Sequence, residues 1–467
     1  MVCKPSNEQG IVMIPVEKSK ARANPTKAFF VRMITRDITL EDCIFDLIDN
    51  SVDGAWERAG GRPMSLNNDT DLSAYKISIE IDQNRFLIKD NCGGISLDDA
   101  VNYAFTFGRR DDADTENFSI GVYGIGMKRA VFKLGSSIDI TSTYVGDDGL
   151  SSFKVPVNVS DWLEAGNSSW DFDIDEADDL DEPGVCIEVQ DLSEATAQSF
   201  ASPRFVQDLR RAIARDYALH LHRGLVIDVQ GKPIKGWSIE MRQGGDFSPM
   251  RESFKEKIDG EDVFIELLAG MEALPPDDSD PEGDWDENQN QSGWYVVCNG
   301  RIVLAADKTS LTGWGTDNWP QWHPQYSGFM GIIIFSSRRA DLLPLTTTKR
   351  SVDATSPLYR RYRSHMREPS KTWIAYTNAR KQSEREQVAE KESKTKAVPI
   401  FEVSARSEVV LPQVSAKKRT PEANVSYSVP KPKLLRLATA LGNIRMTYKD
   451  VGLKSFEYAY DDLVGEE

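Results

Sequence analysis

One stretch of the chain places three short polar side chains at a helical spacing. Asp46, Asn50 and Asp53 stand at positions i, i+4 and i+7, so on a helix they share one face. Thr39 and Asp42 predict where that helix begins, because they form a capping box ahead of an apolar stripe. Polar groups beside a buried stripe cost free energy unless they are bonded. The pattern indicates either a solvated helix face or a polar binding site.

A second element combines a carboxylate with glycines. Asp90 ends a predicted strand, and Cys92, Gly93 and Gly94 lead to a helix that Ser96 caps. A carboxylate at a strand end can accept a hydrogen bond from an exocyclic amine, and glycine lets a flat ring approach the backbone. By itself, such a segment is more often an ordinary turn.

A third element is a glycine-rich loop that opens a helix. Gly121, Gly124 and Gly126 precede Met127 and Lys128. Backbone N–H groups at a helix start attract anions, and the lysine adds a positive charge. No strand leads directly into the loop, and Lys128 is not followed by Ser or Thr. The loop therefore matches neither a dinucleotide fingerprint nor a Walker loop.

In order and spacing, the three elements resemble the motifs of the GHKL ATPases, which include DNA gyrase, MutL, the heat-shock chaperone, histidine kinases and MORC proteins. The family's helix motif, Glu-x-x-x-Asn-x-x-Asp-Ala, corresponds to residues 46–54. Its adenine motif corresponds to residues 90–94 and its lid motif to residues 121–128. The resemblance covers about residues 30–200 and is closest to MORC-like or MutL-like bacterial members. It implies a Bergerat-type α/β sandwich that binds ATP and Mg²⁺.

The resemblance also implies roles for single residues. Asn50 would hold Mg²⁺ against the phosphates, with Asp53 also at the nucleotide, and Asp90 would bind the adenine amine beside Gly94. The phosphates would be cradled by Gly124, Gly126, Met127 and Lys128, and Gly121 and Ile125 would also contact the nucleotide. Phe107, Gly108, Arg109 and Arg110 would start the lid that ends at Gly121.

Three residues depart from the family pattern. Asp46 replaces the general-base glutamate and is shorter by one C–C bond of about 1.5 Å, so we expect slow hydrolysis. Cys92 replaces the first glycine of the adenine motif, which requires a turn without positive φ at that position. Val185 follows Gly184 where the family has threonine, which removes one hydroxyl near the adenine.

Length and composition limit the remaining possibilities. A chain of 467 residues predicts two or three domains, and no apolar run is long enough for a membrane span. Five dispersed cysteines are typical of a reducing cytoplasm. His220 and His222 have no cysteine or third histidine nearby, which disfavours a zinc site. The net charge of −17 disfavours binding of nucleic acid over the whole surface.

Breaks in pattern and composition predict the order of domains along the chain. We expect an N-terminal arm (1–27), a GHKL ATP-binding domain (28–200), a transducer-like α/β domain (201–354) with an acidic insertion (275–292), a helix (355–393), a linker (394–432) and a C-terminal docking segment (433–467).

The second half contains further candidates. The resemblance implies a lysine that reaches the γ-phosphate, and Lys349 in the threonine-rich segment 345–350 is the natural choice. Asn299-Gly300-Arg301 reads as a hairpin turn. The cluster of Trp314, Trp319, Trp322 and His323 is either a partner surface or, more simply, core.

These expectations leave three hypotheses open. The first is an ATPase switch that dimerises with ATP and controls an unidentified protein partner or effector, and a role in phage defence is one form of this hypothesis. The second is a DNA-handling clamp of the MORC or MutL sort, which the acidic charge disfavours although residues 413–436 carry six basic side chains. The third is a nucleotide-sensing scaffold without turnover. A histidine kinase is disfavoured because no phospho-acceptor histidine helix lies near the pocket.

Overall fold

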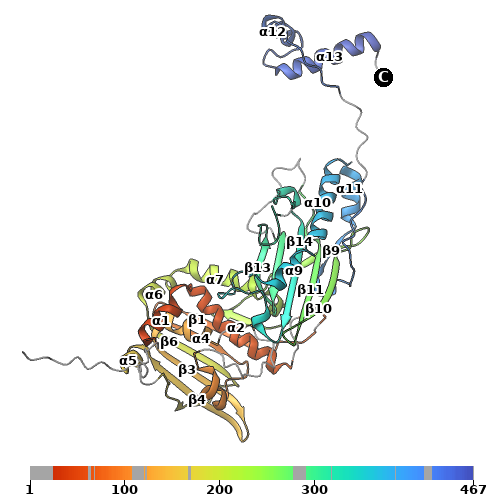
Figure 1. The fold of residues 1–467 in the computed structure, drawn as a ribbon. Coiled ribbons are helices and arrows are strands. Elements are labelled where there is room, and N and C mark those ends of the chain that lie inside the picture. The colour runs from red at the N-terminus through yellow and green to blue at the C-terminus, as the bar shows by residue number, and fades with distance from the viewer. Residues whose placement is uncertain are drawn as a thin grey trace, which may run out of the picture. The chain divides into compact units, whose positions relative to one another are not determined.

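The computed structural model describes residues 25–60, 65–67, 69–107, 120, 124–166, 170–276, 291–316, 318–383, 385–414 and 423–465. The chain divides into two compact units, residues 1–416 and 417–467 (Figure 1). The predicted arm, except for its last three residues, and most of the predicted acidic insertion lie outside the described residues.

The first sheet has eight strands in the order β5-β4-β3-β6-β2-β1-β7-β8. Its strands are β1 (Lys76–Ile81), β2 (Arg85–Asp90), β3 (Gly135–Gly146), β4 (Gly149–Asn158), β5 (Asp175–Glu176), β6 (Gly184–Leu192), β7 (Val226–Val229) and β8 (Lys232–Pro233). Its helices are α1 (Lys27–Arg36), α2 (Leu40–Arg58), α3 (Leu97–Asp99), the π-helix η2 (Ala100–Ala104), α4 (Gly126–Leu134), α5 (Val159–Glu164), α6 (Glu194–Phe200), α7 (Pro203–Asp216) and α8 (Ala218–His222). Helices α1, α2 and α4 lie against one face of the sheet (Figure 1).

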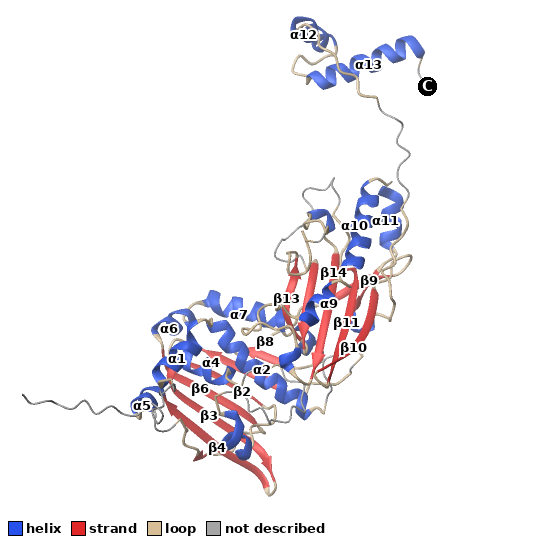
Figure 2. Ribbon diagram, viewed as in Figure 1, coloured by secondary structure: helices blue, strands red, loops and turns tan. Residues whose placement is uncertain are grey.

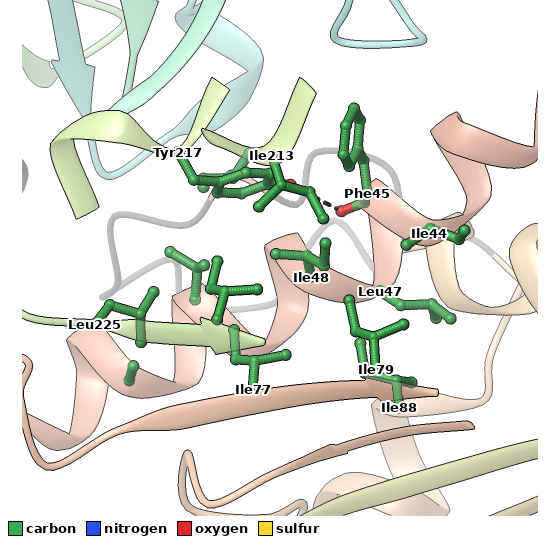
Figure 3. Close-up of a cluster of buried hydrophobic side chains, with 14 of the residues drawn as sticks. Ile44, Phe45, Leu47, Ile48, Ile77, Ile79, Ile88, Ile213, Tyr217 and Leu225 are labelled. Atoms are coloured by element: carbon green, nitrogen blue, oxygen red, sulfur yellow. Dashed lines mark hydrogen bonds between the residues drawn. The ribbon is translucent and has the colours of Figure 1, made fainter. Parts of the chain in front are cut away.

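Local sequence signals account for the start of this domain. The Thr39 hydroxyl accepts a hydrogen bond from the Asp42 N–H, and the Asp42 carboxylate accepts one from the Thr39 N–H, as the capping box predicts. The apolar stripe of α2 packs on the hairpin of β1 and β2. Figure 3 shows Leu47 and Ile48 of α2 beside Ile77 and Ile79 of β1.

The first sheet extends beyond the predicted domain end at residue 200. Strand β7 pairs in parallel with β1, so that Ile77 faces Ile227, and β8 then closes the edge. Apolar β7 side chains are buried in the same core as α2, which explains why the chain returns to this sheet after α7 and α8.

The second sheet runs β13-β12-β14-β11-β9-β15, and β10 also pairs with β11. Its strands are β9 (Glu240–Gln243), β10 (Met250–Ile258), β11 (Glu261–Met271), β12 (Gly293–Cys298), β13 (Arg301–Asp307), β14 (Phe329–Ser337) and β15 (Lys396–Pro399). Short 3₁₀ helices occupy Pro324–Tyr326 (η3), Ala340–Leu342 (η4) and Ile400–Glu402 (η5). Trp314 and Trp319 are buried in the core of this sheet and Trp322 packs against it, as the simpler interpretation expected, whereas His323 is exposed.

The region after residue 354 differs from the predicted single helix and linker. Three helices, α9 (Pro357–Arg363), α10 (Arg367–Lys381) and α11 (Arg385–Ser393), replace the one helix (Figure 2). The turn after α9 lets Tyr362 of α9 and Trp373 of α10 bury their rings in one core. Part of the predicted linker forms β15, because its backbone pairs with β9 at the sheet edge.

The second unit contains two helices, α12 (Lys431–Ala440) and α13 (Tyr448–Val464). In its described part, Ala438 and Val451 are the buried apolar side chains, whereas Phe456 and Leu463 of α13 are exposed. Across the described portion of the chain, we find no helix with both the length and the hydropathy that a membrane crossing requires.

Candidate functional site

Helix α2 carries a row of buried carboxylates. Asp42, Asp46 and Asp49 are 6%, 2% and 0% exposed. Their spacing of i, i+4 and i+7 puts them on one side of the helix. Asn50, next to Asp49 in the chain, is exposed. The helix therefore turns charged groups inward and leaves an amide accessible.

Asp46 lies between a helix start and two cations. Arg129 Nε donates to Asp46 Oδ2 at 2.6 Å, and Lys349 Nζ lies 3.3 Å from Asp46 Oδ1. A Cβ on Gly126 would lie 3.3 Å from the Asp46 carboxyl carbon, so the N-terminus of α4 adjoins this carboxylate. The positive end of a helix favours negative charge in its neighbourhood. The predicted base thus stands beside the predicted phosphate loop.

Asp49 is the most enclosed carboxylate of the row. Tyr217 OH donates to its Oδ1 at 2.7 Å, Lys349 Nζ donates to its Oδ2 at 2.8 Å, and Arg301 Nη1 also donates to Oδ2. Burial alone would raise the pKa of Asp49, but the Arg301 and Lys349 charges outweigh it and hold that pKa below its usual value. Asp49 is therefore ionised and paired.

Lys349 is positioned by a tight turn. Its N–H donates to the Thr346 carbonyl at 2.9 Å, and its φ is 55°, in the left-handed region. The neighbouring Arg350 donates through Nε to Asp42, and Arg129 Nη2 reaches the Thr347 carbonyl at 3.4 Å. Burial lowers the pKa of Lys349, yet Asp49 and Asp46 together raise it above its usual value. The turn thus brings a charged ammonium to α2.

Asp90 has only neutral donors around it. Its Oδ1 accepts from the Cys92 and Val185 N–H groups at 2.9 and 3.2 Å, and its Oδ2 accepts from Ser51 Oγ at 2.6 Å. Burial raises the pKa of Asp90 in spite of these bonds. Oδ2 retains lone-pair capacity for a further donor such as an amine.

Glycines permit the close packing around Asp90. A Cβ on Gly184 would collide with the Asp90 carbonyl oxygen, and a Cβ on Gly94 would collide with the Thr143 carbonyl oxygen. Gly93 and Gly94 have positive φ, whereas Cys92 does not, as predicted for that substitution. The turn therefore accepts cysteine at 92 but needs glycine at 94.

Two predicted residues contact backbone on either side of the predicted lid. Asp53 accepts from the Ile120 N–H through both carboxylate oxygens, at 2.7 and 2.9 Å. Lys128 Nζ donates to the carbonyls of Ala104 and Thr106 at 2.8 and 2.7 Å, and burial lowers its pKa to about 8. Both side chains fasten backbone at the borders of the predicted lid.

Other predicted residues are placed less fully. Gly108, Arg109, Arg110 and Gly121 lie outside the described residues. Gly124, with φ of 63°, and Ile125 lead into α4, and Met127 is buried on it. A cavity of about 520 Å³ lies where the lid begins, lined by aromatic side chains that include Phe105, Phe107, Trp170 and Phe172. Its lining includes none of the carboxylates described above.

A comparison with protein families now bears on this geometry. Residues 38–179 match the family described as histidine kinase-, DNA gyrase B-, and HSP90-like ATPase. This segment is similar to GHKL-type ATPase domains. The matched range contains α2, Asp90 and the N-terminus of α4, and no curated protein matches the chain. With the second sheet and the C-terminal helices, the match confirms the predicted α/β fold class and supports ATP binding.

The donor set of the ATPase-like domain fits Mg·ATP. Asn50 offers an exposed amide oxygen, the hard type of ligand that Mg²⁺ prefers. The N-terminus of α4 offers backbone N–H groups to phosphate, and Asp90 Oδ2 has capacity for the adenine amine. When bound, Mg²⁺ would neutralise phosphate charge, and these residues would orient the nucleotide around it.

Sequence reasoning missed four members of the site. Asp49 stood inside the recognised helix motif, but its partners are 168 to 300 residues away. Arg301 was interpreted as part of a turn, and Asn299 and Gly300 do form one with positive φ. Tyr217 and Arg129 carried no motif. The one available signal was the i, i+4, i+7 spacing of Asp42, Asp46 and Asp49.

Proposed function

We propose that the chain is a Mg²⁺-dependent ATPase of the GHKL type that acts as an ATP-gated switch. In this proposal ATP joins two copies of the chain, and the joined form controls a protein partner. The observation that carries it is the contact of Lys349 with Asp46 and Asp49. Lys349 brings a cation from the second α/β region to the side of α2 that the phosphates would face. Nucleotide binding and the position of that region would therefore depend on each other.

The proposed roles follow the placement of the residues. Asn50 holds Mg²⁺, Asp90 receives the adenine amine beside Gly94, and the N-terminus of α4 receives the phosphates. Asp46 orients the attacking water, and Lys349 contacts the γ-phosphate. Lys128 and Asp53 act at the borders of the lid, where their present bonds hold backbone. Turnover is slow, because the Asp46 carboxylate is short and shared with two cations.

The switch is tested by the mass of the protein with different nucleotides. A non-hydrolysable ATP analogue with Mg²⁺ is expected to convert monomers to dimers in light scattering, and ADP is not, because ADP lacks the γ-phosphate. Lys349→Ala should retain ATP affinity within a few fold and remain monomeric. Lys371→Ala, on the surface of α10, is the matched control and should dimerise normally. Equal masses with analogue and ADP would remove the switch.

A DNA-handling clamp is the alternative. It draws on the basic start of α12, with Lys431, Lys433 and Arg436. Gel shifts on duplex DNA between low and physiological salt test it, since phosphate contacts weaken steeply with salt. No shift at low salt would reject the clamp.

A third form of the proposal has no turnover. Phosphate release from the wild type above the level of Asp46→Ala would reject a scaffold that only senses nucleotide.

The proposed partner belongs to phage defence, and plaque counts in a bacterium that expresses the wild type or Asp90→Ala test that role.

A further inference from the structure

Three buried carboxylates of α2, Asp42, Asp46 and Asp49, form an acidic ladder. Each rung has a cation from a distant part of the chain. Arg350 pairs with Asp42, Lys349 with Asp46 and Asp49, and Arg301 with Asp49. All three cations follow residue 300 in the chain, whereas α2 ends at residue 58. The segments around residues 301 and 349–350 therefore attach to α2 at this ladder.

Asp46 and Asp49 differ in how closely they hold Lys349. Lys349 Nζ lies 2.8 Å from Asp49 Oδ2 and 3.3 Å from Asp46 Oδ1. Asp49 is itself fixed from both sides, by Tyr217 on Oδ1 and by Arg301 on Oδ2. Asp46 is instead shared with Arg129. Asp49 is the rung with the shorter and better supported bond to the lysine.

Burial makes the loss of the Asp49–Lys349 ion pair costly. Asp49 and Lys349 are 0% and 5% exposed, and the Arg301 guanidinium lies 5.2 Å from the Phe45 ring and 5.6 Å from the Tyr217 ring. In such a site water cannot replace a missing partner. Figure 3 shows the Tyr217 ring directed at α2, where its hydroxyl also donates to the Phe45 carbonyl.

We propose that Asp49 is a positioning residue that holds the Lys349 ammonium beside Asp46. An ammonium has three hydrogens; Asp49 Oδ2 accepts one of them, and Asp46 Oδ1 lies 3.3 Å away as an ion-pair partner. A further hydrogen is left for an oxygen of the terminal phosphate. This role rests on the proposed ATPase function, because it assigns Asp49 to the placement of the lysine that the function requires.

The proposal separates two effects on catalysis. Without the Asp49 charge, Lys349 retains only Asp46 as an anionic partner and moves onto it. Asp46 Oδ1 is then blocked from orienting water, and the ammonium no longer faces phosphate. ATP is still bound by Asp90 and the N-terminus of α4. Asp49→Asn is therefore expected to lower kcat at least tenfold and to change KM for ATP less than threefold.

The experiment uses the full chain and three variants. Asp49→Asn removes the charge, Tyr217→Phe removes only the hydroxyl that orients it, and Tyr359→Phe is the matched control. Tyr359 is fully buried in the other core, and its hydroxyl donates to the Leu311 carbonyl at 2.9 Å. Steady-state phosphate release at varied ATP concentration gives kcat and KM. We expect the loss in kcat to decrease from Asp49→Asn to Tyr217→Phe, with none in Tyr359→Phe.

A second readout needs no nucleotide. Amide hydrogen exchange of residues 345–352 should be faster in Asp49→Asn and Tyr217→Phe than in the wild type and Tyr359→Phe. Wild-type kcat and exchange in Asp49→Asn would overturn the positioning role. If the wild type fails to bind ATP, the proposed function fails, and the exchange result alone decides whether Asp49 holds the turn. If Asp49→Asn does not fold, Tyr217→Phe decides, and a normal kcat there overturns the proposal.

Discussion

Asp49 and Asp90 are two buried carboxylates of the ATPase-like domain with opposite surroundings. Asp90 has a hydroxyl and two backbone N–H groups, and its pKa is raised by burial. Asp49 has an arginine, a lysine and a tyrosine, and its pKa is lowered although burial opposes this. Burial therefore disfavours the ionised form of Asp90, whereas the charged partners of Asp49 more than offset the cost of burying its ionised form.

The difference indicates what each position is suited to do. A buried carboxylate without a cation gains from a new donor, and raised pKa values gather at binding sites for this reason. A carboxylate with two buried cations already has its partners and serves attachment between regions. Asp90 therefore suits ligand recognition, and Asp49 suits coupling.

The largest effect is expected from breaking the paired carboxylate. Arg301→Ala leaves Asp49 with a single cation in a dry site, which should lower the free energy of unfolding by roughly 3–5 kcal/mol. Arg85→Ala is the matched control, because Arg85 forms ion pairs with Glu80, Asp82 and Glu188 at the surface of the same domain. Chemical unfolding curves compare the two. Similar losses in both variants would contradict the contrast.

A smaller effect is expected in binding at the adenine end. Asp90→Asn retains the shape and can still pair with Ser51 and the two N–H groups, but it presents an amide where the amine needs an acceptor. ATP affinity should fall by about 1.5–3 kcal/mol, or roughly ten- to a hundredfold. The melting temperature without nucleotide should not fall at pH 7, since a buried charge has been removed. Calorimetry of ATP binding checks the first result, and undiminished affinity would reject the adenine assignment.

The smallest effect is a pair of opposite pH dependences. Asp90 has a raised pKa, so its ionisation opposes folding, and stability rises as pH falls from its folded pKa toward the usual aspartate value. Asp49 has a lowered pKa, so its contribution is present above the usual value and is lost as pH falls through its folded pKa. Unfolding free energies against pH should change slope in opposite directions in Asp90→Asn and Asp49→Asn. Changes of slope in the same direction in the two variants would contradict the contrast.

Local parts of the fold could be predicted from the sequence. The capping box of α2, the β1–β2 hairpin and the Asn299-Gly300 turn all depend on residues close in the chain, and each is present. The strands β10 and β11 were not predicted, because the charged residues of β10 stand in adjacent runs (251–252 and 255–257) without the alternation typical of a strand, and β11 begins with two acids. Strand β15 is stabilised by pairing with β9, about 150 residues earlier, which no local pattern reveals.

The residues of the site likewise fall into those that a local motif reveals and those that only the fold brings together. Asp90 and its glycines lie in one short motif, and the residues of the α4 start lie in another, so both could be found from spacing. The partners of Asp49 come from three separate segments, at residues 217, 301 and 349. A surface arginine and a buried one look alike in a sequence, and only the fold shows that Arg301 is enclosed.

The backbone of Lys349 has a consequence for anyone who redesigns this turn. A left-handed φ of 55° costs a lysine about 1–2 kcal/mol, and glycine would adopt it freely. The turn therefore tolerates a strained backbone conformation at the residue that carries the ammonium group. An optimiser that scores backbone fit alone would choose glycine at 349, improve the local geometry, and erase the cation that joins α2 to the second sheet region. Preference for lysine over glycine at this position therefore reflects the buried ion pairs with Asp46 and Asp49 rather than the backbone conformation of the turn.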